Sequence, residues 1–187
     1  MRTAYIGMGA NLDSAAGPPP ATLAAAALRI GALGRIAARS HLYSTAPVGV
    51  AEQPRFVNAV VALETELPAR DLLRALLAIE REFGRNRARE IRNGPRTLDL
   101  DILLLEDEIV REPDLEIPHP RLLERAFALV PLAEIAPDFR DPRTGISVSQ
   151  LTQRLVSGPP YENTFIFPFE SNLWRPGADG VDPRSPD

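Results

Sequence analysis

The sequence predicts an α+β fold of the ferredoxin-like kind, in which helices pack on a mainly antiparallel sheet. Segments with strand and helix character follow one another in the order strand, helix, strand, strand, helix, strand, which is the order of a split βαβ unit. The chain has 187 residues, of which 44% are hydrophobic and 25% are charged. This length and composition suit one soluble domain with a sizeable core.

The first strand and the first helix are bounded by residues that turn the chain. Residues 3–8 form a β-prone run that ends at Gly9, where we expect a turn. Residues 21–33 are rich in alanine and leucine, which favour helix, and they follow prolines that the first turn of a helix tolerates. Gly34 is the expected end of this helix.

Two strands joined by a long connection come next. Residues 35–43 and 56–67 have strand character, and the second run is rich in valine and phenylalanine. The connection over 44–55 contains two prolines and a glycine and is long for a hairpin. Because loops of this length are often functional, we expect a binding loop here.

The clearest helix covers residues 69–83, between Pro68 and Gly84. At about 100° per residue, its large apolar side chains share an arc of about 160° that faces the core. Glu80 falls inside this arc. A carboxylate there is costly unless it is paired or bound to a cation, so Glu80 either lies at the open end of the arc or has a functional role.

Residues 98–105 form a strand with a polar start and an apolar remainder. Leu103 and Leu105 are expected to continue the face that begins with Asp99 and Asp101. The opposite face carries Leu98, Leu100, Ile102 and Leu104. A strand that is apolar on both faces is typical of the centre of a sheet, so we expect a central strand whose polar end opens at the rim.

The remaining predicted elements are a turn at 106–107, a short return over 108–110, an edge strand over 115–117, and helices over 121–129 and 147–155. His119 lies near the expected N-cap of the helix over 121–129, and Pro120 takes its first position. From residue 157 onward six prolines occur in 31 residues. We therefore expect a domain over 1–156 and a proline-rich tail over 157–187 that docks in part and has a mobile end.

The composition excludes several kinds of chemistry. The 21 Lys and Arg residues are all arginines, so neither a Schiff-base lysine nor a GxxxxGK[ST] phosphate loop is possible. Cysteine is absent, which excludes thiolate metal sites and fits a reducing compartment, so we expect a cytoplasmic protein. The net charge of −4 argues against a general nucleic-acid binder. No apolar run approaches the roughly 20 residues of a membrane helix, so we expect no membrane association.

One segment is strongly basic in spite of the negative net charge. The 16 residues from 81 to 96 contain six arginines and only two glutamates, so this segment has a net charge of +4. The arginines are Arg81, Arg85, Arg87, Arg89, Arg92 and Arg96. Because a guanidinium group matches the geometry of phosphate oxygens, the segment is a candidate polyphosphate clamp, with a solvated charged face as the alternative.

Two aspartates follow this basic segment. In a strand, Asp99 and Asp101 point to the same face with Cα atoms about 6.6 Å apart, so their like charges need a cation. Without cysteine and with only two histidines, the available ligands are mainly oxygens, which favours Mg²⁺ over zinc. An aspartate pair beside many arginines is typical of two-metal phosphoryl transfer.

Several blocks of the sequence, in order, resemble the family of 6-hydroxymethyl-7,8-dihydropterin pyrophosphokinases (2-amino-4-hydroxy-6-hydroxymethyldihydropteridine diphosphokinases). The blocks are Tyr5 to Leu12, Tyr43 to Gly49, Gln53 to Ala59, Gly94 to Ile102, Pro118 to Arg121 and Arg125 to Phe127. The run Gly-Pro-Arg-Thr-Leu-Asp-Leu-Asp in the fourth block is highly specific to the family. The resemblance implies transfer of pyrophosphate from ATP to the hydroxymethyl group of the pterin, with release of AMP, in folate biosynthesis.

The same resemblance implies roles for individual residues. Asp99 and Asp101 would hold two Mg²⁺ ions. The residues implied to be catalytic are Arg85, Arg92, Asp99 and Asp101. Those implied to bind ATP are Glu80, Arg87, Arg96, Ile102, His119 and Arg125. Those implied to bind the pterin are Thr45, Pro47, Val48, Phe56, Asn58 and Phe127. An aromatic pair and an asparagine suit a flat heterocycle with an amide-like edge. Taken singly, the two phenylalanines could be core residues, and Asn58 and His119 could be caps.

The expected partners are small molecules, namely ATP and the dihydropterin, and we expect a monomer. The alternative function is a ferredoxin-like regulatory or RNA-binding module that uses the arginine-rich loop, which predicts salt-sensitive binding of oligonucleotides. A conventional kinase on the same fold is a third possibility, and the nucleotide product would distinguish it.

Overall fold

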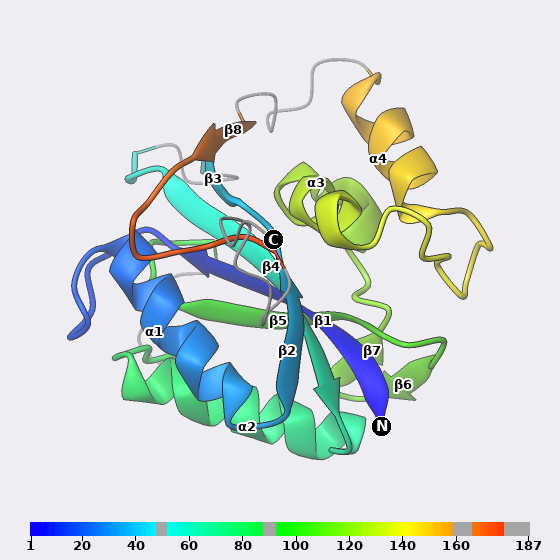
Figure 1. The fold of residues 1–187 in the computed structure, drawn as a ribbon, viewed down its shortest axis with the longest axis horizontal. Helices are drawn as coiled ribbons and strands as arrows, with labels where there is room; N and C mark the ends of the chain where they lie inside the picture. Colours follow the sequence, from blue (N-terminus) through cyan, green and yellow to red (C-terminus); the bar gives the residue numbers. More distant parts are fainter. Residues whose placement is uncertain (48–51, 88–92, 159–165, 178–187) are drawn as a thin grey trace, which may run out of the picture.

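An antiparallel sheet forms the middle of the molecule (Figure 1). The structure is a computed structural model that describes residues 1–47, 52–87, 93–158 and 166–177. Within these ranges the sheet has six strands in the order β5-β1-β4-β3-β8, and β2 also pairs with β4. The strands are β1 (Arg2–Ala10), β2 (Arg35–Arg39), β3 (Leu42–Thr45), β4 (Phe56–Thr65), β5 (Asp99–Leu105) and β8 (Ile166–Phe169). This arrangement confirms the predicted α+β fold.

Helices cover both faces of the sheet (Figure 1). One face packs against α1 (Pro19–Gly31) and α2 (Ala69–Glu82), and the other packs against α3 (Ala126–Ile135) and α4 (Val148–Val156). A short 3-10 helix, η1 (Leu122–Glu124), precedes α3. The hydrophobic core is accordingly divided by the sheet into two clusters.

Alternation along β1 places two glycines at the centre of the strand on the α3 side of the sheet. Ile6 and Met8 are buried toward α1 and α2. Gly7 and Gly9 point to the other face, where they add no side chain. A Cβ atom on Gly7 would lie 3.2 Å from the side chain of Leu103, so this position is tightly filled. The two glycines therefore create the floor on which a pocket can form.

β5 is an edge strand and not the central strand that its sequence predicts, because among the described strands it pairs only with β1. Its outer edge is nevertheless covered. The backbone N–H of Leu100 donates to Glu80 Oε1 at 2.8 Å, and the carbonyl of Leu98 accepts from Arg85 at 3.0 Å. Side chains of α2 and of the following loop therefore take the place of a neighbouring strand. Because they shield this edge from water, β5 can be as apolar as a strand inside the sheet.

A bulge in β5 changes the faces predicted for its last residues. The register between β1 and β5 shifts between Tyr5 and Ile6, opposite Leu103. Leu103 and Leu104 both pack in the cluster with α3, whereas Leu105 joins the cluster with α1 and α2. The expectation that Leu103 and Leu105 share a face is therefore wrong.

The strand predicted over 35–43 is interrupted at Ser40, which separates β2 from β3. Ser40 is fully buried, and its hydroxyl accepts from the Val60 N–H at 2.9 Å and donates to the His41 carbonyl at 2.7 Å. The buried Trp174 donates through its indole N–H to the Ser40 carbonyl at 2.7 Å. The interruption therefore serves as the attachment point of the C-terminal segment, whose strand β8 pairs with β3.

Two further predictions after β5 are corrected. Residues 115–117 form β7 (Leu115–Ile117), which pairs with β6 (Val110–Glu112) in a separate hairpin and not at the edge of the main sheet. The helix predicted over 121–129 is divided into η1 and α3 by Arg125, whose backbone is extended (φ −110°, ψ 90°). His119 is consequently not an N-cap. The last predicted helix is confirmed, since Ser147 caps α4 in a capping box with Gln150.

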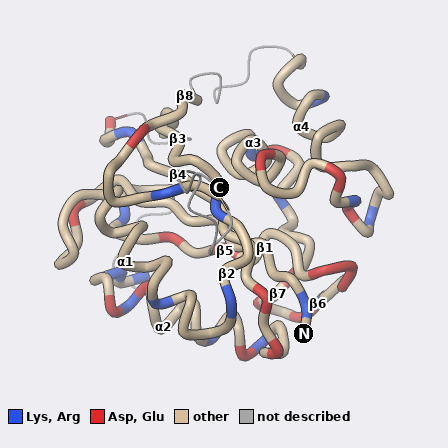
Figure 2. The backbone as a smooth tube through the Cα atoms, in the orientation of Figure 1, with Lys and Arg blue, Asp and Glu red and all other residues tan. Residues whose placement is uncertain are grey.

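Charges of both signs are mixed along the described chain (Figure 2). On the exposed surface of α2, Arg74 pairs with Asp71 at 3.0 Å, and Glu82 pairs with Arg29 of α1 at 3.1 Å. Across residues 1–47, 52–87, 93–158 and 166–177, no helix combines the length and the hydropathy needed to cross a membrane. The end of the tail, which was expected to be mobile, lies outside these ranges.

Candidate active site

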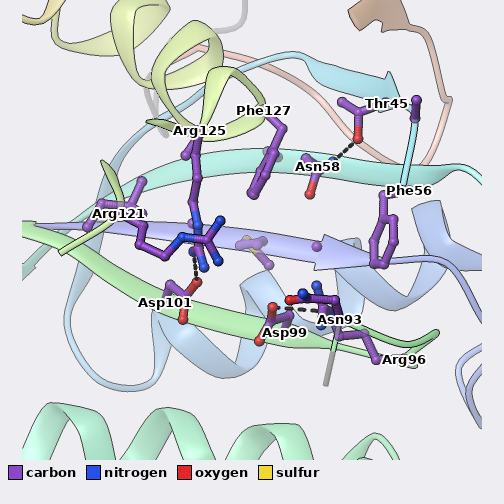
Figure 3. Close-up of a pocket in the computed structure, with 17 residues that line it drawn as sticks. Thr45, Phe56, Asn58, Asn93, Arg96, Asp99, Asp101, Arg121, Arg125 and Phe127 are labelled. Atoms are coloured by element: carbon purple, nitrogen blue, oxygen red, sulfur yellow. Dashed lines mark hydrogen bonds and ion pairs between the residues drawn. The ribbon is translucent and has the colours of Figure 1, made fainter. Parts of the chain in front are cut away.

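A pocket lies on the α3 side of the sheet, above the two glycines of β1 (Figure 3). Its wall combines residues from β3, β4 and β5, from the loop before β5, and from the segment that leads into α3. The residues that line it include Gly9, Thr45, Phe56, Asn58, Arg96, Asp99, Asp101, Arg121, Arg125 and Phe127. The pocket therefore brings together segments that are far apart in the sequence.

One end of the pocket is aromatic and carries a single oriented amide. Phe127 and Phe56 lie on either side of Asn58 (Figure 3). The amide of Asn58 is buried and donates to Thr45 Oγ1 at 2.7 Å, which leaves its carbonyl oxygen available. A Cβ atom on Gly9 would lie only 2.7 Å from Asn58 Oδ1. Glycine at this position is therefore required for the amide to lie against β1.

The other end of the pocket is charged. Asp99 and Asp101 project from the same face of β5, as the alternation of a strand predicts. Asp99 Oδ1 accepts a hydrogen bond from Arg85, and Asp99 Oδ2 forms an ion pair with Arg96 Nε at 3.2 Å. Asp101 accepts a hydrogen bond of 2.8 Å from Arg125. Each of the two aspartates is thus held by guanidinium groups.

Two of these guanidinium groups connect the two ends of the pocket. The guanidinium of Arg96 lies over the ring of Phe56, 4.9 Å from its centroid. That of Arg125 lies over the ring of Phe127 at 5.6 Å. Because the two arginines pair with different aspartates, each aromatic ring is linked through one cation to one carboxylate.

Glu80 is a buried residue of α2 that binds two arginines of the charged end. It is 1% exposed and accepts hydrogen bonds from Arg87 Nε and NH2, both at 2.9 Å, from Arg85 NH1 at 3.1 Å and from the Leu100 N–H. The interpretation that Glu80 lies at an open end of its helix arc is therefore wrong. Glu80 is a buried acceptor that positions two arginines beside Asp99.

The protonation of the acidic groups follows from their surroundings. Burial alone would raise the pKa of Asp99, but the guanidinium groups of Arg96 and Arg85 outweigh burial and hold this pKa below its ordinary value. Burial raises the pKa of Glu80, and the hydrogen bonds from Arg87 oppose this shift. Asp99 is therefore a carboxylate at neutral pH.

His119 lies at the charged end as a neutral imidazole. Burial lowers its pKa, the charge of Asp101 opposes this shift, and the charge of Arg125 acts in the same direction as burial. Its Nδ1 accepts a hydrogen bond of 3.1 Å from the backbone N–H of Arg121. Its Nε2 lies 3.2 Å from Arg125 NH1 and 3.8 Å from an oxygen of Asp101. The imidazole therefore lies against the pair formed by Arg125 and Asp101.

The structure brings most of the expected site residues together but not all of them. The side chain of Ile102 packs in the core cluster with α1 and α2, on the face of β5 opposite the pocket, so it cannot contact a ligand in the pocket. Ala46, and not its neighbour Pro47, lines the pocket. Arg92 and Val48 lie outside the described residues.

Asn11 does not line the pocket but supports it, a role that the sequence did not predict. Its side chain accepts from the Arg96 N–H at 2.8 Å and donates to Gln53 Oε1 and to the Pro54 carbonyl, both at 3.0 Å. The backbone N–H of Asn11 also donates to the Arg96 carbonyl at 3.0 Å. Gln53 in turn donates to the Asn93 carbonyl at 2.9 Å. Asn11 therefore ties the end of β1 to the loops before β4 and β5.

Within the described part of the chain, no group of three or more acidic or histidine side chains is arranged to hold a metal ion by itself. A cation bound at Asp99 and Asp101 would need its other ligands from substrate oxygens and water. This ligand set suits Mg²⁺, which keeps several waters and takes few carboxylates.

Sequence comparisons with known proteins identify the family of the chain. The family model described as 7,8-dihydro-6-hydroxymethylpterin-pyrophosphokinase (HPPK) matches residues 5–137. The 2-amino-4-hydroxy-6-hydroxymethyldihydropteridine pyrophosphokinase of Pseudomonas aeruginosa is 55% identical over 108 residues, which are 58% of this chain and 65% of that protein. The protein of the same name from Haemophilus influenzae is 43% identical over 155 residues, which are 82% of this chain and 93% of that one.

Solved structures agree on the fold. Wild-type HPPK-DHPS of Plasmodium falciparum superposes with a TM-score of 0.64 over 83% of this chain and 45% of that one, at 16% sequence identity. At this identity the match bears on the fold alone. The family model and the bacterial relatives confirm the family predicted from the sequence. The chain belongs to the 7,8-dihydro-6-hydroxymethylpterin-pyrophosphokinase family.

Proposed function

We propose that this chain transfers a pyrophosphoryl group from ATP to the hydroxymethyl oxygen of 6-hydroxymethyl-7,8-dihydropterin and releases AMP, as a step of folate biosynthesis. Membership of the family supports the reaction. The observation that carries the proposal is that an aromatic, amide-bearing end and an arginine-held aspartate pair share one pocket. A pterin alcohol and a polyphosphate would meet there.

The aromatic end supplies what a pterin ring requires. Phe56 and Phe127 can stack on its two faces. The carbonyl oxygen of Asn58 can accept a hydrogen bond from the amide-like edge of the ring, and the hydrogen bond that its NH₂ group donates to Thr45 fixes the orientation of the amide. These contacts would hold the hydroxymethyl group toward the charged end.

Asp99 and Asp101 would hold two Mg²⁺ ions together with the phosphate oxygens of ATP. When bound, the ions would neutralise charge on the transferred group and orient it for in-line attack. A pair of carboxylates on one strand face fits this role, since like charges at this spacing favour a cation. The activity would accordingly depend on Mg²⁺.

The arginines would exchange partners when the substrates bind. Arg96 and Arg125 are now paired with Asp99 and Asp101. A carboxylate that binds a cation gives up part of its attraction for a guanidinium group, which can then bind phosphate oxygens. Arg85 and Arg87 are positioned for the same role by Glu80.

In the reaction, the hydroxymethyl oxygen forms a bond to the β-phosphorus, and the bond from that phosphorus to the oxygen of the α-phosphate breaks. AMP leaves with that oxygen, and the hydroxyl proton passes to solvent. Because no side chain among the described residues of the pocket stands out as a dedicated base, positioning and charge neutralisation would supply most of the rate.

The proposal is tested by the identity of the nucleotide product. The full chain is incubated with ATP, Mg²⁺ and the dihydropterin, and nucleotides are separated by chromatography. We expect AMP that forms only when the pterin is present. Formation of ADP would indicate a conventional kinase, and the absence of any nucleotide product would contradict the assignment.

The alternative of a regulatory or RNA-binding module has little support. Charges of both signs are mixed over the described residues, whereas nucleic-acid binders present a basic face (Figure 2). The cytoplasmic location and the monomeric state expected from the sequence stay predictions.

A further inference from the structure

Arg121 is a residue of the charged end to which the family resemblance assigns no role. Its side chain lines the pocket and extends along the wall toward Arg125 and Asp101 (Figure 3). Its backbone is fixed by the hydrogen bond from its N–H to His119 Nδ1. Arg121 therefore presents a guanidinium group beside the aspartate that is proposed to hold a cation.

Arg121 differs from the other arginines of the pocket in the position of its acidic partner. Arg96 and Arg125 pair with the aspartates inside the pocket. Arg121 pairs through Nε with Glu124 at 3.1 Å, and the side chain of Glu124 is 65% exposed and does not line the pocket. An exposed pair of this kind contributes little to stability, so it can be exchanged for another partner at small cost.

We infer that Arg121 is a further phosphate-binding residue, which leaves Glu124 and binds the polyphosphate chain of the nucleotide when ATP enters. This inference rests on the proposed function. A guanidinium group binds phosphate through two parallel hydrogen bonds, which are stronger than its exposed pair with a carboxylate. Inside the pocket these bonds also gain from partial exclusion of water.

The position of Arg121 favours phosphate over the pterin ring as its ligand. Phe56 and Thr45 lie at the other end of the pocket from Arg121 (Figure 3). The neighbours of Arg121 are Asp101 and Arg125, which are proposed to hold a cation and phosphate oxygens. A phosphate chain bound to Arg125 and to a cation on Asp101 would therefore lie within reach of the Arg121 side chain.

The test compares Arg121→Gln and Glu124→Gln with a control, Arg111→Gln, which changes an exposed arginine of β6 outside the pocket. KM values for ATP and for the pterin are measured, and so is the thermal shift caused by inorganic tripolyphosphate. We expect Arg121→Gln to raise the KM for ATP about tenfold, the low end for a hydrogen bond to a charged group. Its KM for the pterin and its unfolding temperature without ligand should stay unchanged, and its tripolyphosphate shift should be smaller.

Glu124→Gln should have a KM for ATP at or below that of the wild type, because Arg121 is released from its partner. Arg111→Gln should resemble the wild type. A wild-type KM for ATP or an undiminished tripolyphosphate shift in Arg121→Gln would overturn the inference. So would a loss of ATP affinity in Glu124→Gln as large as that in Arg121→Gln, since the ion pair itself would then matter. If the wild type formed no AMP, the proposed reaction would fail, and the tripolyphosphate shift would still decide the role of Arg121.

Discussion

Replacing Glu80 by glutamine would remove a negative charge from a place that water barely reaches. The Glu80 side chain is 2% exposed and accepts hydrogen bonds from Arg85, from Arg87 and from the backbone of Leu100. Glutamine keeps one acceptor oxygen, but its NH₂ group is a donor, as the arginine groups are. If the remaining oxygen takes the place of Oε1, it still accepts from Leu100, Arg85 and Arg87 NH2, so the hydrogen bond lost is the one that Oε2 accepts from Arg87 Nε.

The size of the effect depends on whether the guanidinium of Arg87, which loses this hydrogen bond, can reach water. The Arg87 side chain is 52% exposed, so its guanidinium can be hydrated. Arg85, which is 7% exposed, keeps its bonds to the Leu98 carbonyl and to Asp99. A hydrogen bond to a charged group contributes about 1.5–3 kcal/mol, and hydration of Arg87 reduces the loss, so we expect a free energy of unfolding lower by about 2 kcal/mol.

Glu80→Ala should cost more, because it also leaves the N–H group of Leu100 without a partner and opens a cavity. We expect a loss of about 4 kcal/mol. For a chain of this length, each 1 kcal/mol lowers the unfolding temperature by about 2–4 °C. The expected shifts are therefore about 4–8 °C for Glu80→Gln and about 8–16 °C for Glu80→Ala.

Thermal unfolding followed by circular dichroism measures these shifts. The matched control is Glu82→Gln on the same helix, where Glu82 pairs with Arg29 and their side chains are 52% and 64% exposed. This change should lower the unfolding temperature by less than about 2 °C. If Glu80→Gln unfolded at the same temperature as the control, Glu80 would not have the role that its hydrogen bonds indicate.

Three further changes test other parts of the site and the fold. Gly9→Ala places a Cβ atom 2.7 Å from Asn58 Oδ1, so the amide must move, and the KM for the pterin should rise about tenfold with little loss of stability; an unchanged KM would refute this reading. Asn11→Ala removes the bond to the Arg96 N–H and should lower the free energy of unfolding by about 2 kcal/mol and reduce kcat/KM for ATP, measured by urea unfolding and steady-state kinetics. Burial raises the pKa of Asp141, but hydrogen bonds to an arginine outweigh it and lower this pKa, so its stabilisation is present above about pH 4 and is lost as the pH falls through the lowered pKa. Asp141→Asn should therefore be less stable than the wild type at pH 7, and equal stability there, or a difference that does not shrink as the pH falls below about 4, would contradict the assignment.

Elements with strong local signals were predictable from the sequence. The helix predicted over 69–83 is α2 (Ala69–Glu82), because Pro68 and Gly84 bound it and its apolar side chains recur with the period of a helix. The alternation of β5 likewise placed Asp99 and Asp101 on one face. Such features depend on residues a few positions apart, which the sequence displays directly.

Features that depend on distant contacts were not predictable in this way. β5 reads as a central strand because Glu80 and Arg85 cover its edge, and their contacts arise only in the folded chain. Asn11 bonds to Gln53 and Arg96, which are 42 and 85 positions away, so no local pattern reveals its role. Arg125 ends η1 with an extended backbone and points to Asp101, which a helical pattern cannot show.

In the proposed reaction, the aspartates of β5 support pyrophosphoryl transfer in the pocket that they share with the aromatic end. The most direct test measures pterin-dependent release of AMP by the wild type and by Asp101→Asn under the same conditions, with unfolding temperatures as a check on folding. We predict AMP and pyrophosphorylated pterin in equal amounts from the wild type, and background levels from a variant that remains folded. AMP release by Asp101→Asn at the rate of the wild type would contradict the claim.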